Sequence, residues 1–176
     1  MVNEEAGKYA RYEFERRFLL ARLPEAVRKE DGWLITDRYI TGTRLRLRRM
    51  EPFGGGESTF KLGQKEVPSP PDFSRMTITN IYLSAVEHEV FAALPAHGLR
   101  KRRYRLDHDD RAFSVDVFED RLAGLILAEV GFETTDEWRE DHHLPEFALR
   151  DVSYDFRYTG GSLAAPRAQG VAELLA

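Results

Sequence analysis

In the stretch YEFERRF, residues 12–18, Glu13, Glu15 and Arg17 alternate with Phe14, Arg16 and Phe18. On a β-strand, successive side chains point to opposite faces, so Glu13, Glu15 and Arg17 would share one face and the phenylalanines the other. The aromatic face requires burial. The charged face lies either in water or along a polar interior, and the rest of the sequence bears on that choice.

Segments with strand character recur along the chain and are mostly joined by short turns, such as the glycine-rich PFGGGE at 52–57. We expect strands over residues 11–20, 33–40, 43–50, 58–65, 75–83, 100–107, 112–119 and 125–133. Seven or eight such strands with few helices predict an α+β protein, mainly antiparallel β, whose sheet closes or nearly closes into a barrel.

One longer helix is expected over residues 84–97. Ser84 with Glu87 three residues later is the pattern of a capping box. Four apolar residues are expected to form its buried stripe: Val86, Val90, Phe91 and Leu94. His88 falls on the polar side and is expected to be solvated. Shorter helices are expected over 134–141, 145–150 and at the end of the tail, 162–176.

The composition limits the class of protein. The 176 residues suffice for one domain, 1–176, and 26 basic against 30 acidic residues give a formal net charge of −4. There is no cysteine, which excludes disulfides and thiolate metal sites. No stretch approaches the roughly 18 apolar residues of a membrane span, and the polar N-terminus lacks a signal-peptide core. We therefore expect a cytoplasmic protein without a membrane partner.

The charges are sorted among the predicted strands. Basic residues share faces in three of them: Arg44, Arg46 and Arg48, then Lys61 with Lys65, then Lys101 with Arg103. Carboxylates lie on the first strand and towards the end. Each charged face taken alone fits a solvated surface, but the sorted set favours a charged barrel interior, in which clustered cations require a polyanion.

Arginine suits phosphate because its planar guanidinium bonds two oxygens at once. Carboxylates in the same interior would repel phosphate unless a divalent metal bridges them, and Mg²⁺ or Mn²⁺ takes oxygen ligands from both. The pattern therefore predicts a metal-dependent site for phosphate, with a polyphosphate as ligand.

At this point the sequence resembles the CYTH superfamily, the triphosphate tunnel metalloenzymes. EFERR at 13–17 is similar to their ExExK signature, and six further segments follow in the family's order: RLRLRR at 44–49, TFK at 59–61, LRKRRY at 99–104, SVDVFED at 114–120, LILAEVGF at 125–132 and DVSYDFRYTGGSLA at 151–164. The match covers about residues 9–164 and leaves the tail 165–176. It implies an eight-stranded antiparallel tunnel that binds a triphosphate group with Mg²⁺ or Mn²⁺.

The resemblance also implies roles for individual residues. Catalysis would fall to Glu13, Glu15, Arg17 and Glu129. Phosphate would be bound by Arg44, Arg46, Arg48, Lys61, Lys101 and Arg103. The metal ligands would be Glu13, Glu15 and Glu129, with Asp116 and Glu119 as secondary ligands.

The sequence departs from the family pattern in three places. Arg17 replaces the motif lysine, which keeps the charge but changes the donor geometry. Where the family has an acidic pair on the strand before the helix, this chain has Thr77 and Thr79. Gly131 replaces a carboxylate two residues after Glu129. The interior thus stays strongly cationic with fewer carboxylates.

The function expected from these residues is metal-dependent hydrolysis of inorganic tripolyphosphate. A polyphosphate or nucleotide sensor without turnover is the alternative, and adenylate cyclase or thiamine triphosphatase activity also stays open. Nucleic-acid binding is disfavoured, because leucines rather than aromatic residues alternate with the arginines of 44–49. The oligomeric state stays open, a homodimer included.

Overall fold

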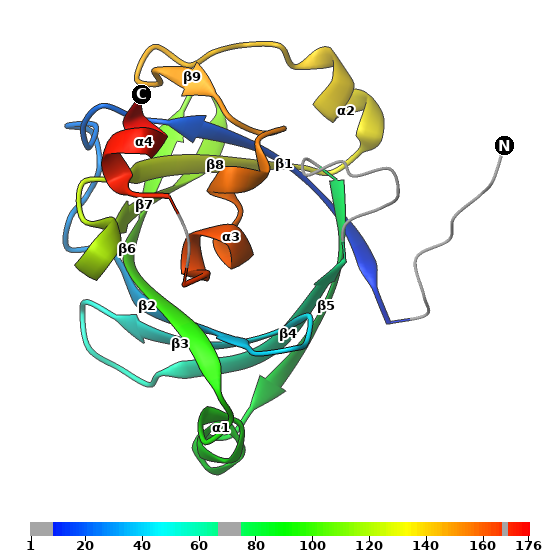
Figure 1. The fold of residues 1–176 in the computed structure, drawn as a ribbon. Helices are drawn as coiled ribbons and strands as arrows, with labels where there is room; N and C mark the ends of the chain where they lie inside the picture. The colour runs from blue at the N-terminus through cyan, green and yellow to red at the C-terminus, as the bar shows by residue number, and fades with distance from the viewer. Residues whose placement is uncertain (1–8, 67–74, 167–168) are drawn as a thin grey trace, which may run out of the picture.

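The structure, a computed structural model, describes residues 9–66, 75–166 and 169–176. In these ranges, eight strands close into an antiparallel barrel (Figure 1). They are β1 (Arg11–Leu19), β2 (Gly32–Ile40), β3 (Leu45–Pro52), β4 (Thr59–Glu66), β5 (Arg75–Leu83), β6 (Ala96–His108), β7 (Arg111–Phe118) and β8 (Ile126–Phe132). The barrel and its antiparallel pairing confirm the predicted fold class.

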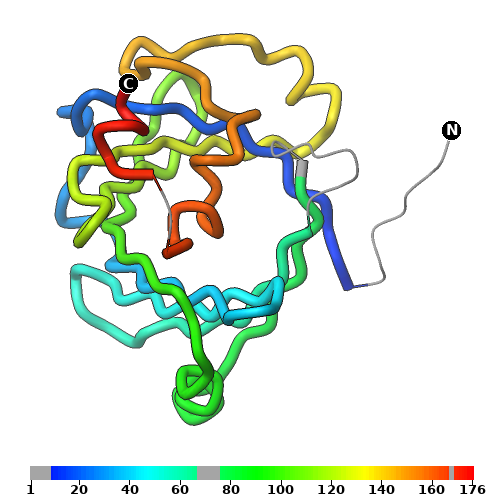
Figure 2. Tube along the Cα trace, viewed as in Figure 1, coloured from blue at the N-terminus to red at the C-terminus, as the bar shows by residue number. Residues whose placement is uncertain are grey.

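The strands follow one another around the barrel in the order β5-β4-β3-β2-β6-β7-β8-β1, and a pairing of β1 with β5 closes the ring. Among the described residues, this closing seam joins Arg11–Phe14 to Arg75–Ile78 through four residue pairs, whereas β2 and β6 share nine. Figure 2 shows the blue trace of β1 running beside the green trace of β5 where the ring closes. The short strand β9 (Arg150–Asp151) adds to the other part of β1.

Most of the hydrophobic core lies outside the barrel wall. The outward residues of β1, β7 and β8 form one cluster with Trp138 of α2 (Thr135–Glu140). A smaller cluster packs beneath α1 (Ala85–Ala92). A third closes over one end of the barrel, where 3₁₀-helix η2 (Phe156–Tyr158), α3 (Gly160–Ala164) and α4 (Val171–Leu175) meet Phe118 and Leu127. Because these clusters take the apolar sides of the strands, the charged sides are left facing inward.

Helix α1 differs from the sequence prediction in length. It ends at Ala92 rather than near 97, and β6 begins at Ala96. Pro95 disfavours helical geometry at the residue before it, so the chain turns extended there. Arg38 stabilises this end, donating hydrogen bonds to the carbonyls of Ala92 at 3.0 Å and Leu94 at 3.1 Å.

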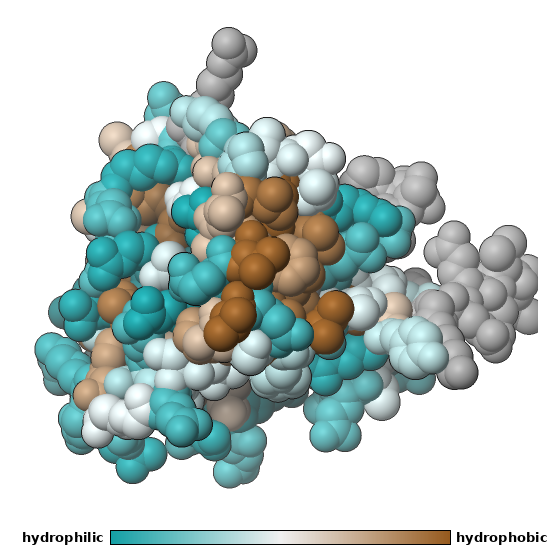
Figure 3. All heavy atoms as spheres, turned by 90° about the horizontal axis from the view of Figure 1, so that it is seen from below, coloured by the Kyte–Doolittle hydropathy of each residue, from teal (hydrophilic) through white to brown (hydrophobic). Residues whose placement is uncertain are grey.

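The buried face of α1 was also predicted wrongly. His88 is buried against the ring of Phe60, 4.6 Å between centroids, while Val86 and Val90 are 76% and 67% exposed. Leu94 is exposed as well, and of the expected stripe only Phe91 packs inward. Helix α1 has only eight residues, so its own pattern of apolar residues is a weak guide. Its contacts with β3 and β4 decide which face is buried. Figure 3 looks onto this side and shows apolar side chains gathered on its surface.

The remaining helical predictions were right in part. Helix α2 confirms the helix expected over 134–141, and α4 confirms a helix at the end of the tail; α3, over Gly160–Ala164, was not predicted. The helix expected over 145–150 is wrong, because this segment is a turn that leads into β9. A further 3₁₀-helix, η1 (Asp120–Leu122), joins β7 to β8. In the described ranges, none of the helices has the length and hydropathy needed to cross a membrane.

Candidate functional site

The barrel encloses a cavity of about 410 Å³ lined by ionic side chains. Of the described residues, nine cations line it: Arg11, Arg17, Arg44, Arg46, Arg48, Lys61, Lys65, Lys101 and Arg103. Three carboxylates join them: Glu13, Glu15 and Glu129. Cations thus outnumber carboxylates threefold in a protein whose net charge is −4.

The structure brings most of the sequence-predicted site residues into this one cavity. Every predicted catalytic and phosphate-binding residue lines it. Asp116 is 1% exposed and lies in the wall behind Lys101 and Arg103. Glu119 is the exception, because it pairs with Arg100 and Arg102, whose side chains are exposed on the outer side of β6. Its placement among the metal ligands is therefore corrected: alternation sends Glu119 away from the cavity.

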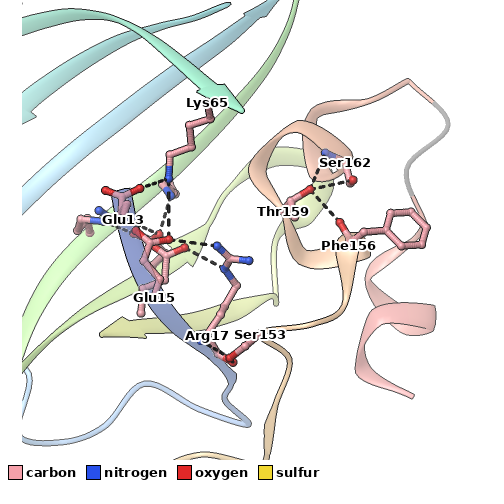
Figure 4. Close-up of polar contacts among 12 residues, drawn as sticks. Glu13, Glu15, Arg17, Lys65, Ser153, Phe156, Thr159 and Ser162 are labelled. Atoms are coloured by element: carbon pink, nitrogen blue, oxygen red, sulfur yellow. Dashed lines mark hydrogen bonds and ion pairs between the residues drawn. The ribbon is translucent and has the colours of Figure 1, made fainter. Parts of the chain in front are cut away.

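Glu13 and Glu15 enter the cavity side by side from β1, and the ammonium group of Lys65 reaches them from β4 (Figure 4). Lys65 Nζ lies 2.6 Å from Glu13 Oε2 and 3.8 Å from Glu15 Oε2. Burial tends to raise the pKa of Glu13, but the charge and hydrogen bond of Lys65 outweigh it and lower that pKa. The pKa of Glu15 is raised, by burial and by repulsion from Glu129 and Glu13, although Lys65 opposes the shift.

Arg17 and Arg103 hold Glu129, the third carboxylate of the cavity. Arg17 Nε donates to Glu129 Oε1 at 2.9 Å, and Arg103 Nη2 donates to Glu129 Oε2 at 2.8 Å. Arg17 also lies 3.5 Å from Glu15 Oε2, and its backbone is fixed by a 2.9 Å hydrogen bond to Ser153 Oγ (Figure 4). Burial would raise the pKa of Glu129, but Arg17 and Arg103 hold it well below the usual range. Glu129 is therefore ionised and fixed in orientation.

Two buried aspartates support the cationic wall from behind. Asp116 accepts hydrogen bonds from Lys101 at 2.6 Å and from Nε and Nη2 of Arg103, each at 2.7 Å. Asp37 accepts from Arg48 Nε at 2.6 Å and Nη2 at 2.7 Å. In each case burial opposes ionisation, but the neighbouring cations lower the aspartate pKa. These carboxylates therefore fix the orientation of the cations in the cavity wall.

Several residues of this site were not found from the sequence, among them Arg11, Asp37, Tyr39 and Lys65. Asp37 and Tyr39 alternate in WLITDRYI and share the inward face of β2, a signal that the two-residue period could have given. Lys65 was placed on the correct face but was not assigned to the site, because its contact with β1 crosses β5 and only the closed barrel creates it.

The sequence analysis placed Thr77 and Thr79 where the family has its acidic pair, and this placement needs correction. The cavity-lining residues of β5 are Met76, Ile78 and Asn80, and Met76 is in register with Glu13. A shift of one residue turns a strand's side chains to its other face, so the threonines point away from the cavity. The wall beside Glu13 is therefore apolar.

The end of the cavity near α3 is built differently from its centre. Tyr158, Thr159 and Gly160 line it, and Figure 1 shows α3 in front of the barrel opening. Thr159 Oγ1 donates to the carbonyl of Phe156 at 2.8 Å and lies 2.9 Å from Ser162 Oγ, which ties η2 to α3 (Figure 4). Gly160 lies so close to the hydroxyl of Tyr39 that a Cβ there would overlap with it. This end is thus closely packed.

In the part of the chain that the structure describes, no group of three or more His, Asp or Glu residues is arranged to hold a metal ion. Glu13 and Glu15 nevertheless suit one divalent ion. They supply oxygen ligands from one strand, and Glu15 Oε2 is buried without a hydrogen-bond donor among the described residues. Mg²⁺ is commonly held by one or two carboxylates together with substrate phosphates, so this pair fits an ion shared with a ligand.

Comparison of the sequence with protein-family models and with curated proteins finds no match. Several solved structures are similar to this chain in fold. The inorganic triphosphatase NE1496 is 25% identical with a TM-score of 0.57, over 86% of this chain and 93% of that one. A putative adenylate cyclase from Bacillus halodurans is 16% identical with a TM-score of 0.51, over 74% of this chain and 86% of that one. The PH1819 protein from Pyrococcus horikoshii OT3 is 14% identical with a TM-score of 0.51, over 73% and 82%. The closed barrel and these similarities establish that the chain has the CYTH fold, that of the triphosphate tunnel metalloenzymes.

Proposed function

We propose that this protein binds inorganic tripolyphosphate inside the barrel and hydrolyses one of its phosphoanhydride bonds, with Mg²⁺ or Mn²⁺ as cofactor. The observation that carries the proposal is the convergence of nine cations and three carboxylates on one cavity. The similarity of this chain to a solved inorganic triphosphatase supports the reaction class and the substrate.

The cations divide into two groups by their partners. Arg48 and Arg103 already form bidentate bonds with buried aspartates, so they offer fixed positive charge rather than both sides of the guanidinium. Arg46 is less engaged, since its Nε has no hydrogen-bond partner among the described residues, and Lys61 lies over the ring of Tyr82 at 4.9 Å. Arg46 and Lys61 therefore contact the phosphate oxygens directly, and the fixed cations stabilise the charge that develops in the transition state.

Hydrolysis requires that water attack a terminal phosphorus while the bridging P–O bond breaks, which yields pyrophosphate and phosphate. Glu129, ionised and held by Arg17 and Arg103, accepts a hydrogen bond from that water and orients it. A divalent ion held by Glu13 and Glu15 would supply charge neutralisation at the phosphoryl oxygens. The protein's own contribution is orientation and preorganised positive charge.

The proposal is tested by phosphate release from tripolyphosphate with Mg²⁺ or Mn²⁺. Wild-type protein should turn over, and Glu13→Gln and Glu15→Gln should each lower kcat by about 10²-fold or more, because each removes a charged oxygen ligand. Glu51→Gln, on the outer face of β3 and paired with Arg49, is the matched control and should retain activity. Wild-type protein that binds tripolyphosphate without releasing phosphate would contradict hydrolysis.

That last outcome defines the second candidate, a polyphosphate or nucleotide sensor. One observation favours it: each of Glu13, Glu15 and Glu129 already has a cationic partner. Stabilisation by tripolyphosphate without product would establish the sensor. Cyclic AMP formed from ATP would indicate a cyclase, and phosphate released from thiamine triphosphate but not from tripolyphosphate would change the substrate.

A further inference from the structure

The ammonium group of Lys65 lies between the two β1 carboxylates. Its Nζ is 2.6 Å from Glu13 Oε2 and 3.8 Å from Glu15 Oε2, and the Lys65 side chain is 28% exposed (Figure 4). A bridging divalent ion would require the same two carboxylates. The protein thus supplies a cation of its own where the proposed function needs a metal.

The surroundings make Lys65 the main partner of Glu13. On β5, the residues that face the cavity beside Glu13 are Met76 and Ile78, which provide no charge. Glu15 has a second cation, Arg17, at 3.5 Å. Because burial makes an unpaired carboxylate costly, Lys65 stabilises the pair of carboxylates in the absence of metal.

An ammonium ion and a divalent ion cannot occupy one position between the same oxygens. A metal that binds both Glu13 and Glu15 must therefore displace Lys65 Nζ, and the energy of that ion pair is subtracted from metal binding. The lysine stem is flexible and partly exposed, so displacement needs only a change of rotamer towards the cavity. There the displaced ammonium would face the phosphate oxygens of a ligand.

We propose that Lys65 is an internal competitor of the divalent metal, which sets the metal affinity of the Glu13–Glu15 pair. The proposal rests on the proposed function, in which these two carboxylates hold the metal. It extends that function, because metal binding becomes coupled to the ligand: a polyphosphate that attracts the ammonium frees the carboxylates. In the absence of ligand, Lys65 keeps the metal affinity low.

The test is Mn²⁺ binding to the ligand-free protein, measured by calorimetry and by the electron paramagnetic resonance signal of free Mn²⁺. Lys65→Met keeps most of the stem and removes the charge, so it should bind Mn²⁺ about tenfold more tightly than wild type, or better. Lys61→Met is the control. It removes a cation from the same face of the same strand, but one that lies over Tyr82, and should raise the affinity by no more than about threefold.

Thermal melting of each variant checks folding, because Lys65→Met leaves two carboxylates facing each other. If that variant does not fold, Lys65→Gln keeps a hydrogen-bond donor without the charge and should show the same gain. Equal affinity in wild type and the Lys65 variants, with measurable binding, would overturn the competition and leave the proposed function standing. Absence of Mn²⁺ binding in every protein would overturn both. If the Lys61 and Lys65 variants gained equal Mn²⁺ affinity, the cause would be the total positive charge of the cavity. That result would also overturn the proposed competition by Lys65.

Discussion

At the scale of single residues, the cavity depends on two buried aspartates that hold its cations, although Asp116 was expected from the sequence to be a secondary metal ligand. Asp37 and Asp116 are each 1% exposed, and each holds one or more cations of the wall. A buried ion pair contributes little net stability, but loss of one partner is costly because the other charge stays buried. We therefore interpret these aspartates as residues that position the cations.

Asp37→Asn should lower the free energy of unfolding at pH 7 by about 3–5 kcal/mol, because Arg48 then remains buried without its partner. Burial would raise the pKa of Asp37, but Arg48 and Arg46 lower it below its ordinary value of 3.8. A lowered pKa means that the stabilisation is complete above about pH 4 and is lost as the pH falls further.

Urea unfolding of wild type and Asp37→Asn at pH 7 and at pH 3 measures this effect. The difference between the two proteins should shrink by about 1 kcal/mol between these pH values, since one pH unit corresponds to about 1.4 kcal/mol per proton. A difference that stays constant would show that the pairing of Asp37 does not control acid stability.

At the scale of elements, two-residue alternation accounts for what the sequence predicted well. In strands with an apolar face and a charged face, such as β1 and β3, only one orientation buries the apolar side chains in the core and turns the charged ones to the cavity. On β5 each face mixes polar and apolar residues, so alternation could not tell Thr77 from Ile78 as the inward residue. The buried face of helix α1 was predicted wrongly for a related reason, because eight residues carry only a weak periodic signal. The contact of Lys65 with β1 depends on ring closure, which no local pattern contains.

The packing of α3 gives a test at this scale. Gly160→Ala should destabilise the protein by about 1–3 kcal/mol, because the new Cβ overlaps the Tyr39 hydroxyl. Gly161→Ala is the matched control in the same helix, since its Cβ would lie 3.8 Å from the Tyr39 ring, an ordinary contact. Chemical denaturation measures both variants, and Tyr39→Phe should partly restore the Gly160 variant by removing the hydroxyl. Equal stability of the two alanine variants would contradict close packing at this end.

At the scale of the whole molecule, the barrel is closed unevenly. Among the described residues, four pairs join β1 to β5, against nine between β2 and β6, yet the Lys65–Glu13 ion pair reaches across this seam. Local opening favours regions with few backbone hydrogen bonds and buried contacts. The seam is therefore the region from which the barrel is expected to open.

Hydrogen exchange followed by mass spectrometry should find amides of the β1–β5 seam exchanging about tenfold or more faster than those shared by β2 and β6. Tripolyphosphate should slow exchange at the seam more than elsewhere, because it draws Arg11, Lys65 and the β3 arginines around one ligand. The β2–β6 amides serve as the internal reference. Uniform protection around the ring, with or without ligand, would be inconsistent with a weak seam.

The inward concentration of positive charge has a consequence for which polyanions the protein encounters. Because the cavity carries an excess of cations while the chain as a whole is at −4, the remaining surface must be more negative than that total. We therefore expect a polyanion as wide as a nucleic-acid duplex to meet a surface that is negative on balance and to be kept from the cations inside the barrel. A thin, linear anion would gain those cations, so we expect the protein to select polyanions by width rather than by base or sugar.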